Sequence, residues 1–210
     1  MEFIFSHAMA GILSSICLLI GGIPYLIDIH KGRVKPHILS WLGWGLITAL
    51  GGAAMVAEGS TWAVALLFAN TVVCLLIAAY SALRKAGVWS TGPQDIAFFV
   101  FGLIGLILWQ ITDVPMYALV LSIIADASFG IPTIIKTLKD PSSETLFPWS
   151  MSVTSEIFGM LALKVFAFHE VAYPLYLFFY DITILLIVIG TLRSRATKSV
   201  PASFSNTSTP

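Results

Sequence analysis

The chain has 210 residues, of which 58% are hydrophobic and 10% charged, and its mean hydropathy is +0.92. Soluble domains carry about 25% charged residues, so this composition excludes an ordinary soluble domain and favours an all-α membrane protein. The formal net charge is zero, and no basic tract points to a nucleic-acid partner. The two cysteines lie inside apolar runs, where they act as small packing residues.

Long apolar runs predict seven transmembrane helices, since a spanning helix needs about 20 mostly apolar residues. In chain order the runs occupy residues 8–29, 37–57, 62–83, 95–112, 115–137, 145–167 and 171–192. The polar segment 196–210 is predicted to be a disordered cytoplasmic tail.

The basic residues orient these helices. Ten of the eleven lie in alternate loops or near the C-terminus, namely Lys31, Arg33, Lys35, Arg84, Lys85, Lys136, Lys139, Arg193, Arg195 and Lys198. The opposite loops carry Glu2, Glu58, Asp113 and Glu170 and no Lys or Arg. Because basic loops stay in the cytoplasm, we expect a multi-pass protein with its N-terminus outside and its C-terminus cytoplasmic.

One motif occurs twice, 108 residues apart. The identical pairs are Gly22/Gly130, Ile23/Ile131, Pro24/Pro132, Ile27/Ile135, Lys31/Lys139 and Trp41/Trp149. In each copy an apolar helix with an internal proline leads through a charged loop into a second apolar helix. This pattern predicts a three-helix repeat in 1–86, a linker helix in 87–113 and a second repeat in 114–195. The linker makes the repeats parallel, an arrangement found in transporters.

The second copy continues from Pro132 and Thr133 through Lys136 and Lys139 into a Ser-Ser-Glu-Thr-Leu loop. The first copy matches the same pattern less closely. Together the two copies resemble the superfamily of PQ-loop, saliva-type and SWEET membrane proteins over nearly the whole chain. Thr133 and Tyr25 replace the glutamine of the family motif. The resemblance implies a three-one-three helix plan and a substrate pocket lined by one residue from the third helix and one from the seventh.

Ionisable residues inside the apolar runs are the candidate functional residues, because a charge at the bilayer centre costs roughly 2.5–3.5 kcal/mol. Asp126, Glu156 and Asp181 each lie about ten residues from a helix end, near the midplane. Desolvation and mutual repulsion favour the protonated form of at least one of them. The repeat aligns Asp126 with Leu18, Glu156 with Thr48 and Asp181 approximately with Asn70.

The resemblance implies that Asn70 and Asp181 line the substrate pocket, and that Glu156 corresponds to the acid of proton-coupled members. We therefore predict a substrate and proton pathway through Asn70, Asp126, Glu156 and Asp181. The alternatives are structural: Asp181 and Asn70 hydrogen-bond a neighbouring helix, and Asp126 lies at the edge of a close helix contact. Lys164 either pairs with Glu156 on one helix face or extends its ammonium to the interface.

Two further pairs are candidates for the moving parts. Pro24 and Pro132 act either as hinges or as static kinks, because an internal proline removes one helical hydrogen bond. Trp41 and Trp149 either close the cytoplasmic side of a pore or belong to an interfacial aromatic belt.

The sequence thus predicts an alternating-access transporter of a small polar solute, either proton-coupled or specific for a cationic or zwitterionic substrate such as an amino acid or amine. The alternatives are a sugar-type facilitator and, from another class, a non-transporting receptor or assembly factor. No nucleophile–base set, metal-ligand spacing or cofactor motif is visible, so neither enzyme activity nor a cofactor is expected. The expected partners are a small molecule, protons and the lipid bilayer, and a homo-oligomer is left open.

Overall fold

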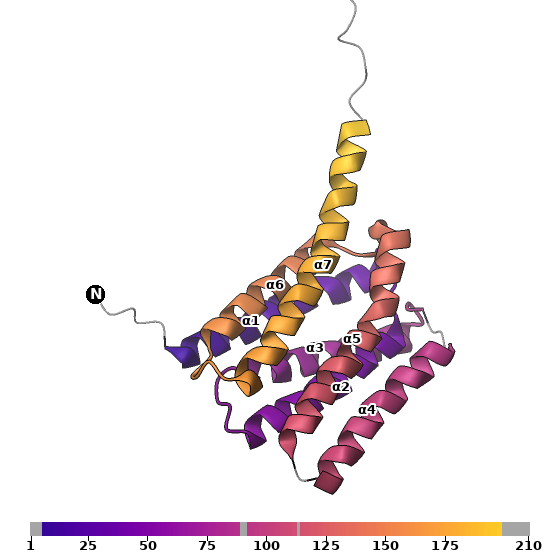
Figure 1. Ribbon diagram of the computed structural model, residues 1–210. Helices are drawn as coiled ribbons and strands as arrows, with labels where there is room; N and C mark the ends of the chain where they lie inside the picture. Colours follow the sequence, from indigo (N-terminus) through magenta and orange to yellow (C-terminus); the bar gives the residue numbers. More distant parts are fainter. Residues whose placement is uncertain (1–5, 89–91, 113, 199–210) are drawn as a thin grey trace, which may run out of the picture.

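The computed structural model describes residues 6–88, 92–112 and 114–198, and these residues form helices joined by short loops. The elements are α1 (His7–His30), α2 (Ile38–Ala57), α3 (Val64–Arg84), α4 (Pro93–Thr112), α5 (Pro115–Lys139), the short 3-10 helix η1 (Pro141–Ser143), α6 (Leu146–Leu161) and α7 (Phe168–Lys198) (Figure 1). The predicted all-α class is confirmed for the described part of the chain. Residues 199–210, most of the predicted disordered tail, lie outside the described residues, whereas 196–198 belong to α7.

Five helices are long and apolar enough to cross a membrane: α1, α2, α3, α5 and the Phe168–Gly190 part of α7. This supports the predicted multi-pass membrane class. Within the described residues, neither α4 nor α6 is among the five. With 16 residues, α6 is about 24 Å long, shorter than a hydrocarbon core of about 30 Å. Five of the seven expected transmembrane helices are therefore supported.

The sixth helix ends at Leu161, earlier than the predicted residue 167. Glu170, in the first turn of α7, accepts hydrogen bonds from the backbone N–H groups of Lys164 (2.7 Å) and Val165 (3.1 Å), which fixes this segment as a loop. Lys164 is exposed in that loop. The expectation that Lys164 shares a helix face with Glu156 is wrong, and so is the expectation that the loops on this side carry no Lys.

The helices pack in the same order within each predicted repeat. α3 packs against both α1 and α2, and α7 packs against both α5 and α6. Contacts between α1 and α6 and between α2 and α5 then join the two sets of three helices. α4 packs mainly on α5 and lies at the edge of the bundle (Figure 1).

Glycines allow two of these helix contacts to be close. A Cβ added at Gly21 of α1 would lie 2.9 Å from Met151 Cβ of α6, and one added at Gly130 of α5 would lie 2.4 Å from the Tyr180 ring of α7. Helix association in a membrane relies on such close van der Waals packing, because lipid tails are as apolar as the side chains.

The basic loops gather at one end of the bundle (Figure 1). Val88, after α3, exchanges backbone hydrogen bonds with Pro36 and Ile38 (2.7 and 3.0 Å), and Lys136 Nζ donates to Lys35 O at 3.3 Å. The α2–α3 and α6–α7 loops lie at the opposite end (Figure 1). The basic loops identified in the sequence therefore lie at one end of the bundle, and Lys164 lies at the other.

Candidate functional site

A cavity of about 50 Å³ lies where α1, α2, α3, α5, α6 and α7 meet, and all six contribute residues to its wall. A space of this size holds a few water molecules. The helices around it come from both predicted repeats. Side chains from both sets of three helices therefore meet around this internal space.

The predicted site residues converge on this cavity. Asn70, Asp126, Asp181, Trp41 and Trp149 all line its wall. They come from five different helices, so tertiary packing brings them together. Asp126 is 1% exposed and Asp181 8% exposed, so both carboxyl groups are removed from bulk water and face the internal space instead.

The fourth predicted residue, Glu156, lies just behind the wall and is 1% exposed. Its carboxyl group is hydrogen-bonded to that of Asp181, which in turn interacts electrostatically with Asp126. Among the described residues, Glu156 Oε2 has no hydrogen-bond partner. The three carboxyl groups thus form a line from α5 through α7 to α6, with Asp181 in the middle.

Asp126 is held by aromatic residues of neighbouring helices. The Tyr173 hydroxyl of α7 donates to its carboxyl group at 3.3 Å, and Trp44 Nε1 of α2 donates to its backbone carbonyl at 3.2 Å. Two more carbonyls of α5 are bound nearby: Ser40 Oγ donates to Phe129 O and Tyr180 OH donates to Gly130 O, both at 3.0 Å. These contacts hold the part of α5 just before Pro132.

Both predicted hinge prolines lie within helices, Pro24 in α1 and Pro132 in α5. Each removes a backbone donor from its helix. Pro24 immediately precedes Tyr25, which lines the cavity, so a bend at this proline would move a cavity residue. The side chain of Pro132 lies outside the described side chains.

A ring of aromatic side chains surrounds one part of the cavity. Trp41 contacts Trp44 and Trp149, with ring centroids 5.2 and 6.4 Å apart, and Tyr180 contacts Trp44 and Trp149 at 5.7 and 6.5 Å. Tyr25 adds a fifth ring, 5.1 Å from Trp41. The repeat-paired Trp41 and Trp149 therefore lie against each other beside the cavity.

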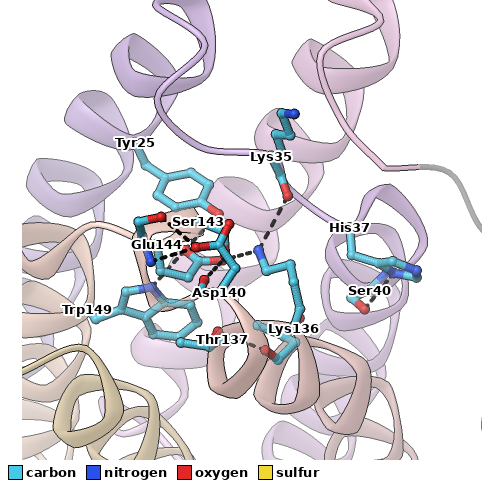
Figure 2. A network of polar contacts seen from close by, with 12 residues as sticks. Tyr25, Lys35, His37, Ser40, Lys136, Thr137, Asp140, Ser143, Glu144 and Trp149 are labelled. Atoms are coloured by element: carbon cyan, nitrogen blue, oxygen red, sulfur yellow. Dashed lines mark hydrogen bonds and ion pairs between the residues drawn. The ribbon is translucent and has the colours of Figure 1, made fainter. Parts of the chain in front are cut away.

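A buried polar network lies at the basic-loop end of the site (Figure 2). The carboxylate of Glu144 accepts hydrogen bonds from Tyr25 OH (3.1 Å) and Trp149 Nε1 (3.0 Å) and forms an ion pair with Lys136. Lys136 also donates to Lys35 O. The network links α1, α5 and α6. Through Glu144 it connects Tyr25 and Trp149, two residues of the cavity wall.

Sequence reasoning missed the role of Glu144. It occupies a short polar loop in which Lys, Ser and Thr neighbours predict exposure, yet only 1% of its side chain is exposed. The sequence did contain a signal. Between Lys136 and the start of α6 there are two acids, Asp140 and Glu144, and either could pair with that lysine.

No protein-family model, curated protein or solved structure matches the chain in comparisons with known proteins. The function therefore has to be inferred from the site itself. Its lining supplies carboxyl groups, one side-chain amide and aromatic rings. Such groups can bind a small polar solute and hold or pass a proton.

Proposed function

We propose that the chain is an alternating-access transporter of a small polar solute. The observation that carries this proposal is the central cavity, whose wall includes Asn70, Asp126 and Asp181 and comes from both sets of three helices. Transporters built from repeats bind substrate where the repeats meet. In this proposal α4 is the linker, and α4 and α6 complete seven spans in the three-one-three plan that the motifs resemble.

Repeat-aligned positions in matching environments support the duplicated plan. The pairs Leu18/Asp126, Asn70/Asp181 and Trp41/Trp149 all line the same cavity. Ile23 and Ile131, identical in the two motif copies, are 59% and 45% exposed on the outside of the bundle. An approximate twofold relation between the sets of helices accounts for both observations.

The line of carboxyl groups supports proton coupling over a sugar-type facilitator. A facilitator requires no buried acid behind its binding site, whereas Glu156 is buried there with an unpaired carboxyl oxygen. An unpaired buried polar atom is costly, and in membrane proteins such acids commonly relay protons. Glu156 is therefore the proposed proton carrier, and Asp181 connects it with the cavity.

Accessibility of Cys74 tests whether the cavity opens alternately. Cys74 lines the cavity, and Cys17→Ala makes it the only cysteine of the chain. A membrane-impermeant thiol reagent should then modify Cys74 in sealed cells and also in inverted membrane vesicles. The receptor or assembly-factor alternative, in which the cavity stays sealed, predicts modification from neither side.

Cysteine labelling also tests the proposed topology. In a background lacking Cys17 and Cys74, Ser6→Cys and Ser205→Cys should be labelled on opposite faces of the membrane, Ser6→Cys outside. The reason is the odd number of spans together with basic loops on one face. Labelling of both positions from the same face would contradict the three-one-three plan.

The prolines are expected to set the rate of exchange between open forms. Pro24→Ala or Pro132→Ala restores a backbone donor and straightens the helix, so exchange between inward and outward states should slow, with folding nearly intact. The modification rates of Cys74 from the two sides measure this. Unchanged rates in both variants would leave the prolines as packing features.

A further inference from the structure

The wall of the cavity has a pronounced chemical bias. It includes two carboxyl groups, those of Asp126 and Asp181, and among its described lining residues none is Lys, Arg or His. The nearby ammonium group of Lys136 is not part of the lining and forms an ion pair with Glu144. A positive charge in the cavity would meet unopposed acidic groups.

We propose that the cavity binds a compact organic ammonium ion that carries no carboxylate of its own, such as a small alkylamine. This inference rests on the proposed function, because it names the substrate class of that site. It separates amines from amino acids, two classes that the sequence left together.

The aromatic ring provides the first part of the argument. Trp41, Trp44, Tyr180 and Trp149 form a closed cycle in which each ring contacts the next. Neighbouring rings are tilted by 43° to 89° rather than stacked in parallel. Aromatic walls of this kind attract cations through their π electrons, most strongly where water is excluded.

The engaged donors provide the second part. Trp44 Nε1 and Tyr180 OH donate to carbonyls of α5, and Tyr25 OH and Trp149 Nε1 donate to Glu144. These polar hydrogens are thereby unavailable to a substrate carboxylate. The Asn70 amide remains as a neutral donor on the wall, but a zwitterion would bring its carboxylate into the same small space as Asp126 and Asp181, where like charges repel strongly.

The third part is size. The space open to the centres of water-sized groups is about 50 Å³, so a small head group enters with limited rearrangement, whereas a long or branched solute requires the wall to open. The combination of acidic groups, aromatic walls and small volume thus fits a compact ammonium ion better than an amino acid or a sugar.

A binding measurement tests this without relying on transport. The purified full-length protein in nanodiscs is titrated at mildly alkaline pH with propylammonium, β-alanine or propanol, and tryptophan fluorescence is recorded. β-Alanine replaces the terminal methyl group of propylammonium by a carboxylate, and propanol replaces its charge by a neutral hydroxyl. We expect saturable quenching by propylammonium with a Kd lower by about tenfold or more than for the other two.

Variants assign the effect to the cavity. Asp181→Asn and Tyr180→Leu should weaken propylammonium binding by about tenfold, and Tyr180→Phe, which keeps the ring, should bind more tightly than Tyr180→Leu. Asp28→Asn is the matched control, because Asp28 pairs with Arg33 outside the cavity; its binding should equal that of the unaltered protein. Size-exclusion profiles confirm that each variant is folded.

The outcomes distinguish this inference from the proposed function. Equal binding of β-alanine or propanol, or no saturable binding of propylammonium, would overturn the ammonium site even if Cys74 is accessible from both faces. Selective ammonium binding with Cys74 modified from neither face would support the ammonium site and contradict transport.

Discussion

Glu156→Gln is expected to abolish uptake driven by a pH gradient, lowering it to the rate of protein-free liposomes, while sparing solute exchange at equal pH. Glutamine keeps the shape of the side chain and removes its proton exchange. Glu156 is the acid that lies behind the cavity with an unpaired oxygen, so the binding surface itself remains. Uptake and counterflow in proteoliposomes measure the two activities separately.

The other acids give a different expected result. Asp181→Asn changes the lining itself and makes the site resemble Asn70 across the cavity, so substrate binding should weaken. Asp28→Asn, outside the cavity, should leave uptake unaltered. If Glu156→Gln, Asp126→Asn and Asp181→Asn all keep full gradient-driven uptake, proton coupling is wrong and a facilitator becomes the better interpretation.

Glu144→Ala is expected to increase modification of Cys74 from the basic-loop face by about tenfold or more. The carboxylate holds Tyr25, Trp149 and Lys136 together at that end of the cavity (Figure 2). A hydrogen bond to a charged group contributes about 1.5–3 kcal/mol, so losing the carboxylate removes much of the free energy that holds this end closed. The measurement uses the Cys17→Ala background and inverted vesicles.

A buried acid at the other end supplies the control for this experiment. Glu170 is buried as well, but its partners are backbone N–H groups of the α6–α7 loop. Glu170→Gln keeps an accepting oxygen at that loop and should leave modification from the basic-loop face unchanged. An unchanged rate in Glu144→Ala would show that its network is not what closes the cavity.

Hydrophobic patterning predicted much of the fold and the acidic residues of the site. A run of about 20 apolar residues has few structural solutions in lipid, so a helix is found close to each predicted range. Acids within such runs, including Asp126 and Asp181, stand out because burial of an ionisable group is costly. The same reasoning drew attention to Glu156.

Other features depended on tertiary contacts that patterning does not contain. The end of α6 is set by the Glu170 side chain, which accepts hydrogen bonds from N–H groups of the loop. From the sequence, that residue was expected in a solvated loop. In a helix that is apolar all round, periodicity does not define which face turns inward. The repeat marked Trp41 and Trp149 as candidate pore residues, but the inward rotation of Trp44, and with it the closed aromatic ring, was therefore outside the reach of the sequence.

The packing of α1 against α6 also affects how the chain is made. α1 leaves the ribosome before α6, which follows more than a hundred residues later. The Gly21 face that fits against Met151 must therefore wait in the bilayer, facing lipid or an assisting protein, until α6 has been made. Domains normally fold as their segments emerge, but here the first helix completes its packing only when the last part of the bundle has been inserted.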